Sequence, residues 1–244
     1  MFPPQARTPT RLDRLDALRG LAIAWMVAYH FAFDLNHFGL VARQNFYADP
    51  LWTVQRTCIL SLFLFCAGVG QAVAHDRGQP WPRFWRRWAQ IAGCALLVSA
   101  GSWLAFPRSF ISFGVLHGMA LMLVLARLTA PWGRWLWLAG LIALVLPRVA
   151  ATPALEGPWL NWIGLVTRKP ITEDFVPLLP WMGVMWWGLA AGQWLLAQRP
   201  GLLGGQLPGG LRPLAAAGRW PLGIYMVHQP LFFGILTLWL KLRG

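Results

Sequence analysis

Apolar residues are gathered into seven runs along the chain, and short segments that hold most of the charged residues separate these runs. A helix needs about 20 apolar residues to cross the hydrocarbon core of a bilayer, which is about 30 Å thick. The fifth run, with about 15 residues, is barely long enough to cross. We predict seven membrane-spanning helices, over residues 15–39, 57–74, 88–106, 111–126, 132–146, 176–197 and 220–240.

The composition agrees with a membrane protein. Apolar residues make up 57% of the 244 residues and charged residues only 12%, whereas soluble domains carry about 25% charged residues. The predicted fold class is therefore all-α, a polytopic membrane bundle of about seven transmembrane helices. No internal repeat is visible, and we predict a short cytoplasmic tail, residues 1–14, followed by a single membrane domain, residues 15–244.

The basic residues predict the orientation of the chain in the membrane. Cytoplasmic loops carry an excess of Lys and Arg, so the side with the larger number is predicted to be cytoplasmic, and with it the N-terminus. The net charge of +13 does not indicate nucleic-acid binding, because the basic residues are spread over short loops, where they set orientation and attract anionic lipid headgroups. Of the 21 Lys and Arg residues, thirteen lie on the predicted cytoplasmic side: Arg7, Arg11, Arg14, Arg19, Arg77, Arg83, Arg86, Arg87, Arg127, Arg134, Arg199, Arg212 and Arg219.

The cysteines do not suggest a metal centre. Cys58, Cys66 and Cys94 all lie inside apolar runs. Their spacing matches neither a zinc site nor a disulfide framework. We therefore expect no metal and no disulfide bond.

The first apolar run carries a stripe of polar side chains. His30 follows Arg19 by eleven residues, which leaves the two only about 20° apart around an ideal helix. Asp16, Asp34 and His37 fall within about 40° of His30 by the same count. Ionisable groups at membrane depth cost several kcal/mol unless they face a partner or water, so the stripe predicts a functional site. The alternative is a polar seam that only holds helices together.

Two further histidines are predicted to lie at a similar depth. His30 is about 16 Å beyond Arg19 along its helix, His117 about 9 Å from the outer end of the fourth span, and His228 about 14 Å beyond Arg219. Taken singly, each is better explained as a hydrogen-bonded packing residue. Together, and beside Asp34, they suggest a polar centre in the middle to outer part of the membrane. A carboxylate one helical turn from an imidazole can orient the ring, so His30 and Asp34 could act as a general base.

Arginines and tryptophans are interleaved in the segment WPRFWRRW, after the second apolar run. Arg83, Arg86 and Arg87 lie within about one and a half turns if this segment is helical. Guanidinium groups bind phosphate in a bidentate manner, so this cluster, together with Arg19, could admit an anionic cofactor from the cytoplasm. Alone, it would be read as an orientation signal.

These features together resemble the membrane acyl-CoA-dependent acyltransferases. The spacing from Arg19 to His30 is similar to the arginine–histidine signature of bacterial sugar O-acyltransferases, and Arg83 with Arg86 is similar to their RxxR pattern. The closer resemblance, over nearly the whole chain, is to the bacterial relatives of the heparan-alpha-glucosaminide N-acetyltransferase catalytic domain. It rests on five segments, in this order: RLDRLDALRGLAI, YHFAFDLNHFG, ISFGVLHGMAL, DFVPLLPWMGV and GRWPLGIYMVHQP.

The resemblance implies an enzyme of the bacterial inner membrane that moves an acyl group from cytosolic acetyl-CoA, or another acyl-CoA, to an amine or hydroxyl of a glycan or glycolipid on the far face. The expected partners are this donor, the acceptor, membrane lipids and, as one alternative, a second copy of the chain. His30 would be the catalytic histidine, with His37, His117 or His228 as alternatives. The candidate residues are His30, Asp34, His117 and His228 for catalysis, Arg19, Arg83, Arg86 and Arg87 for the coenzyme, and His37 and Asp174 for the acceptor.

Three other functions remain open from the sequence. A proton-coupled transporter or flippase could use His30, Asp34 and His228 as a relay, although the small number of helices and the absence of a repeated half are untypical of that class. A haem-binding electron carrier could use paired histidines as axial ligands. A non-catalytic assembly factor for an envelope glycan would tolerate loss of His30.

Overall fold

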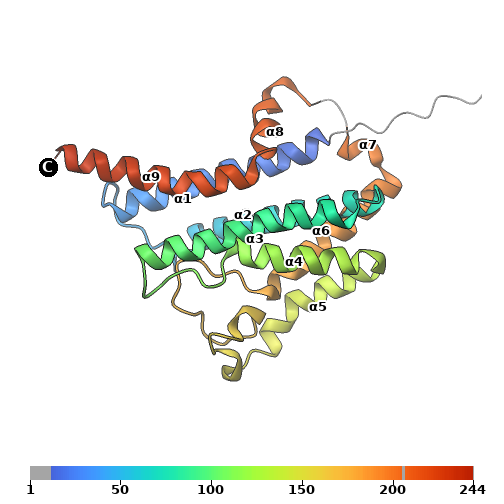
Figure 1. Ribbon diagram of the computed structural model, residues 1–244, viewed down its shortest axis with the longest axis horizontal. Helices are drawn as coiled ribbons and strands as arrows, with labels where there is room; N and C mark the ends of the chain where they lie inside the picture. Colours follow the sequence, from blue (N-terminus) through green and yellow to red (C-terminus); the bar gives the residue numbers. More distant parts are fainter. Residues whose placement is uncertain (1–11, 205–206, 244) are drawn as a thin grey trace, which may run out of the picture. The chain divides into compact units, whose positions relative to one another are not determined.

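The computed structural model describes residues 12–204 and 207–243, and most of this part of the chain is helical. Its α-helices are α1 (Asp13–His37), α2 (Pro50–Asp76), α3 (Trp81–Ala105), α4 (Val115–Thr129), α5 (Trp135–Val149), α6 (Leu178–Gln198), α7 (Pro200–Leu203), α8 (Arg212–Gly218) and α9 (Pro221–Arg243). Four short 3-10 turns accompany them: η1 (Ala130–Trp132), η2 (Pro153–Leu155), η3 (Asn161–Ile163) and η4 (Gly209–Leu211). The predicted all-α class is confirmed (Figure 1).

Each of the seven apolar runs falls on a helix, namely α1 to α6 and α9. Within the described residues, four helices are both long and apolar enough to cross a membrane: α2, α3, α4 extended by η1, and α9. Helix α5 is apolar but has only 15 residues. The chain is thus a membrane protein with several candidate spans, and the number seven and the cytoplasmic N-terminus remain predictions. Most of the predicted tail, residues 1–11, lies outside the described residues.

Several helices begin earlier than the apolar runs do. Helix α2 begins at Pro50 rather than near residue 57, because the carboxylate of Asp49 accepts a hydrogen bond from the backbone N–H of Leu51 at 2.8 Å. Proline is well suited to the first position of a helix, where its missing N–H is not needed. Helix α3 likewise begins at Trp81 rather than at residue 88, so the segment WPRFWRRW forms its first turns.

The chain divides into two compact units. The first comprises Met1–Phe63 and Ala197–Gly244, and the second comprises Leu64–Leu196, so the division falls within α2. The prediction of a single membrane domain stays a prediction.

In the first unit, helices α1, α8 and α9 pack together (Figure 1). Helix α8 approaches α1 so closely that only glycine fits at the contact: a Cβ on Gly20 would lie 1.8 Å from the carbonyl oxygen of Leu214, and one on Gly218 would lie 1.8 Å from that of Asp16. Beyond this contact, α1 continues alongside α9. The N-terminal half of α1 therefore packs against α8, and its C-terminal half packs against α9.

The end of α1 is fixed by its own backbone. Gly39 has a φ of +69°, in the left-handed region that glycine favours. Its N–H donates to the carbonyl of Asn36 at 3.2 Å, and the N–H of Leu40 donates to that of Leu35 at 2.9 Å. These two bonds form a Schellman motif, which satisfies carbonyls left free at a helix end.

In the second unit, the rest of α2 packs closely against α6. A Cβ on Gly188 would lie 2.2 Å from the carbonyl oxygen of Phe65, so the two helices meet backbone to backbone at this point. Helix α3 lies beside α4, and the indole N–H of Trp88 donates to the carbonyl of Ala120 at 2.9 Å. Small residues and aromatic donors are common means of joining helices in membrane proteins.

Candidate active site

Helices α1 and α9 bring four polar side chains together in the first unit. His30 and Asp34 come from α1, and His228 and Gln229 come from α9. The rings of His30 and His228 meet edge to face, with centroids 5.0 Å apart and planes at 86°. The side-chain amide of Gln229 donates a hydrogen bond to Oδ1 of Asp34 at 2.9 Å. We refer to these four residues as the polar cluster.

The backbone of α9 determines the tautomer of His228. Nδ1 lies 2.8 Å from the carbonyl oxygen of Tyr225 and 3.2 Å from that of Ile224. A carbonyl oxygen can only accept, so Nδ1 must carry the proton and donate it. In the neutral ring Nε2 then carries the lone pair. Pro230, which lacks a backbone N–H, follows two residues later in the same helix.

Three buried atoms of the polar cluster lack a hydrogen-bond partner within the described part of the chain. They are Oδ2 of Asp34, Nε2 of His228 and Oε1 of Gln229. Asp34 is completely buried, and His228 is 7% exposed. Buried polar atoms are normally hydrogen-bonded, because an unpaired one costs about 1–3 kcal/mol. All three can accept a hydrogen bond, so the cluster suits a group that donates protons.

The predicted stripe on α1 therefore faces other helices. His30 contacts His228, Asp34 contacts Gln229, and Asp16 lies under α8. The carboxylate of Asp34, which the sequence led us to expect beside the His30 ring, instead accepts its hydrogen bond from Gln229. Sequence reasoning missed Gln229, although it directly follows His228 in the segment VHQP.

Arginines surround the other end of α1. Arg19 forms an ion pair with Asp16 at 3.0 Å, one helical turn away, and its side chain is 28% exposed. Arg219 pairs with Asp13 at 3.1 Å, and Arg14 donates to the carbonyls at the end of α7. Arg19 thus keeps guanidinium N–H groups beyond its one carboxylate partner, and a phosphate could accept from them.

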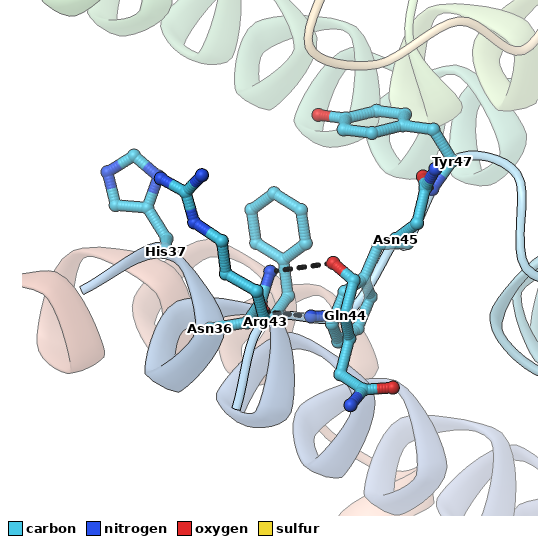
Figure 2. Close-up of a pocket in the computed structure, with 8 residues that line it drawn as sticks. Asn36, His37, Arg43, Gln44, Asn45 and Tyr47 are labelled. Atoms are coloured by element: carbon cyan, nitrogen blue, oxygen red, sulfur yellow. Dashed lines mark hydrogen bonds between the residues drawn. The ribbon is translucent and has the colours of Figure 1, made fainter. Parts of the chain in front are cut away.

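A pocket of about 500 Å³ lies where α1 ends. Its walls are Phe33, Asn36 and His37 of α1, together with residues 43–47 of the following loop (Figure 2). His37, one of the predicted acceptor residues, is exposed, and its ring packs against Phe233 with centroids 5.6 Å apart. His37 is therefore beside a cavity, whereas His30 is inside the helix packing.

In the second unit, the start of α4 holds the other two sequence candidates. The hydroxyl of Ser99 donates to the carbonyl of Ile111 at 2.6 Å, so it must accept at 3.1 Å from Nε2–H of His117. Nδ1 of His117 accepts from the backbone N–H of Gly114 at 3.3 Å. Asp174 accepts from the N–H of Val115 at 2.7 Å, which also caps α4. Both ring nitrogens of His117 are thus engaged.

The predicted coenzyme arginines of α3 are all exposed. Arg83, Arg86 and Arg87 lie in its first two turns, next to the exposed rings of Trp81 and Trp85. These rings are stacked, with centroids 5.9 Å apart. The segment presents cationic and aromatic side chains together, an arrangement that suits phosphates or a membrane surface.

A comparison with known protein families identifies the family of the chain. The family model described as heparan-alpha-glucosaminide N-acetyltransferase, catalytic, matches residues 11–230. The chain belongs to this family. It matches no curated protein and no solved structure at a significant level.

Membership in the heparan-alpha-glucosaminide N-acetyltransferase catalytic family identifies the chain as a membrane acetyltransferase of a family that uses acetyl-CoA as donor. The match includes all four residues of the polar cluster and every residue predicted for the coenzyme and the acceptor. Within the described residues, no group of three or more His, Cys, Asp or Glu side chains is arranged to hold a metal ion.

Proposed function

We propose that the chain transfers an acetyl or short acyl group from cytosolic acyl-CoA to an amine or hydroxyl of a glycan or glycolipid on the extracytoplasmic side. The observation that carries this proposal is the buried polar cluster on α1 and α9, with its unpaired acceptor atoms. Acyl transfer requires a base that takes a proton from the attacking nucleophile. A buried imidazole with a free lone pair is suited to that role.

The proposed reaction uses the two paired histidines. The acceptor nitrogen or oxygen attacks the thioester carbonyl, and Nε2 of His228 or a nitrogen of His30 takes its proton. The carbon–sulfur bond then breaks, the coenzyme leaves as a thiolate, and the proton can pass to the sulfur. Asp34 contacts Gln229 rather than either ring, so in this proposal its charge favours the protonated imidazole from a distance within the polar cluster. Gln229 holds that carboxylate in place.

Other candidate residues have supporting roles in the proposal. The candidates for contacting the phosphates of the coenzyme are Arg19 in the first unit and, separately, Arg83, Arg86 and Arg87 in the second. The candidates for contacting the acceptor are His37 in the first unit and, separately, Asp174 in the second. For His117 we favour a structural role, because both of its ring nitrogens are already hydrogen-bonded.

Together with this function, we propose the topology that the sequence predicts. The chain crosses a bacterial inner membrane seven times, and its N-terminus is cytoplasmic. The supporting observation is that seven apolar runs correspond to helices and that the larger number of basic residues falls on one set of connections. In that orientation the start of α1 with Arg19 faces the cytoplasm, and the pocket at its end faces outward.

Proteoliposomes test the function directly. Acetyl-CoA labelled in its acetyl group is supplied on the side of the N-terminus, located with a protease-sensitive tag, and an aminosugar is supplied on the other side. We expect labelled product on the aminosugar side from the wild type and at least about 100-fold slower formation of it by His30→Ala or His228→Ala. Product only on the side of acetyl-CoA would refute the transmembrane part, and no product from any acceptor would refute the enzyme.

A proton-coupled transporter is the second candidate, because a buried carboxylate with an unpaired oxygen is also suited to a proton relay. The same vesicles distinguish the two functions. Uptake of a sugar that depends on a proton gradient, without turnover of acetyl-CoA, would support the transporter.

A further inference from the structure

The loop that follows α1 is anchored by a buried aromatic side chain. Phe46 is only 3% exposed, and its ring stacks on that of Trp52 with centroids 3.9 Å apart. It also meets Tyr29 and Phe33 edge to face. An aromatic residue packed in this way fixes the loop beside it, so Phe46 gives the pocket that it helps to line a fixed wall.

Hydrogen bonds hold the same loop to α1. The side-chain amide of Asn36 accepts from the backbone N–H of Gln44 at 2.7 Å and donates to its carbonyl at 3.2 Å. Figure 2 shows these two bonds between the helix and the loop. Asn45 then accepts from the N–H groups of Tyr47 and Ala48. The backbone on the C-terminal side of Arg43 is therefore fixed at both Gln44 and Asn45.

The pocket contains basic groups and no acidic ones. Arg43 and His37 both line it, and Figure 2 shows the guanidinium and the imidazole at the same end of the residues drawn. None of the described lining residues is Asp or Glu. The carboxylates nearest in sequence are engaged elsewhere, Asp34 with Gln229 and Asp49 with the start of α2. Among the described residues, Arg43 has no ion-pair partner.

We propose that this pocket binds an anionic group, a carboxylate or a phosphate, of the acceptor, through Arg43 and His37. A guanidinium with a free planar edge matches such a group in a bidentate manner. Phe33 and Tyr47 supply apolar surface of the kind that lines small-molecule pockets. The assignment of the anion to the acceptor rests on the proposed acetyltransferase function.

The position of the pocket along α1 limits the size of the acceptor. Along the helix axis, His37 lies three residues, or about 5 Å, beyond Asp34 and seven residues, or about 10 Å, beyond His30. An acceptor held by its anionic group at His37 and Arg43 would bring its nucleophile to the polar cluster if the two groups are separated by a similar distance. That separation fits an aminosugar that carries its negative charge on the same or the neighbouring ring.

Ligand binding without acetyl-CoA tests this proposal apart from catalysis. The full-length protein, in a neutral maltoside detergent, is titrated with glucosamine 6-phosphate, with muramic acid, which carries a carboxylate, and with glucosamine, which has the same amine but no acidic group. We expect the anionic probes to bind about tenfold more tightly than glucosamine, a difference typical of one charge-assisted contact. Arg43→Gln should remove the difference, and Arg43→Lys should retain part of it, because Lys keeps the charge without the planar fork.

Arg108→Gln is the matched control. Arg108 is also exposed and lies on a loop predicted to face the same side of the membrane, so its loss removes equal charge and should leave the preference unchanged. Equal or absent binding of all three probes by the wild type, or a preference that survives Arg43→Gln, would overturn the proposal. The thermal unfolding midpoint should not change with Arg43→Gln, which keeps a loss of binding distinct from a loss of structure.

A lipid phosphate is the other source of the same chemistry. The titration is therefore repeated in nanodiscs of phosphatidylcholine, with and without phosphatidylglycerol. If phosphatidylglycerol abolishes the advantage of the anionic sugars in the wild type, the pocket is a lipid site and the proposal for the acceptor is overturned. If the preference persists but no acetyl transfer is found, the inference about the anion stands and the proposed enzymatic function falls.

Discussion

The two units each contain a buried or half-buried histidine network, and the networks differ in what they leave free. In the second unit, His117 uses both ring nitrogens, one toward Ser99 and one toward Gly114. In the first unit, His228 uses only Nδ1, and Nε2 is buried without a partner in the described part of the chain. The sequence predicted both histidines at similar depth. Only the hydrogen-bond pattern separates a histidine that holds a turn together from one that can still bind a proton.

The largest expected effect comes from the histidines of the polar cluster. His30→Ala and His228→Ala should each lower kcat for acetyl transfer by about 10²–10⁴-fold, the usual contribution of a general base. If the two rings act as one unit, the double variant should be little worse than either single one, since effects within a unit are not additive. Initial rates with labelled acetyl-CoA measure this, with circular dichroism to check that the variants are folded. A double variant whose losses multiply would show that the two rings act independently.

A smaller effect is expected from Gln229, which we propose as a positioning residue. Gln229→Ala removes the hydrogen bond to Asp34 and should lower kcat by about tenfold with little change in KM, because a bond to a charged group contributes about 1.5–3 kcal/mol. Gln193 in the second unit is the matched control: its amide donates to the carbonyl of Ala130 at 2.7 Å. Gln193→Ala should lower the thermal unfolding midpoint and leave kcat unchanged. Equal losses of kcat in both variants would remove the special role of Gln229.

For His117 we expect the reverse of the result for the polar cluster, namely a loss of stability with little loss of kcat. His117→Ala should destabilise the protein by about 1–3 kcal/mol, because it leaves the buried backbone N–H of Gly114 without its acceptor. The effect on kcat should be no more than a few-fold. Ser99→Ala, which removes the other partner of the ring, should have a similar profile. A fall of 100-fold or more in kcat, at an unchanged unfolding midpoint, would restore His117 as a candidate base.

The elements of the fold that could be predicted were those set by composition over long runs. Each of the seven apolar runs falls on a helix, because a long, mostly apolar run satisfies its backbone hydrogen bonds within itself only as a helix. The start of α2 was placed too late because polar residues open that helix: Asp49 and Pro50 carry a recognisable start signal, but they lie outside the apolar run. Local capping chemistry, rather than hydropathy, decides such boundaries.

The candidate site was predicted in part for a related reason. His30, Asp34 and His228 are ionisable residues in apolar runs, so they are visible without any knowledge of contacts. Gln229 is an uncharged residue beside a proline, and its partner Asp34 is 195 positions away. Gln229 bonds to Asp34, and Nε2 of His228 stays unpaired, because of the way α1 packs against α9. The sequence of either helix alone does not contain that information.

The smallest expected effect concerns the arginines of α3 in the second unit. They are exposed, and a single exposed ion pair contributes up to about 1 kcal/mol. Arg83→Ala and Arg86→Ala should therefore each raise KM for acetyl-CoA by about two- to fivefold and leave kcat unchanged, because a phosphate contact is made equally in the ground state and the transition state. Dephospho-acetyl-CoA lacks one phosphate of acetyl-CoA. If these arginines bind that phosphate, the two substitutions should raise KM less for dephospho-acetyl-CoA than for acetyl-CoA. Arg148→Ala removes an exposed arginine from the C-terminal end of α5. It is the control for the change in net charge and should leave KM unchanged. If KM does not change in either α3 variant, these arginines serve only to orient the chain, and coenzyme recognition would have to rely on Arg19 and the basic residues near the start of α1.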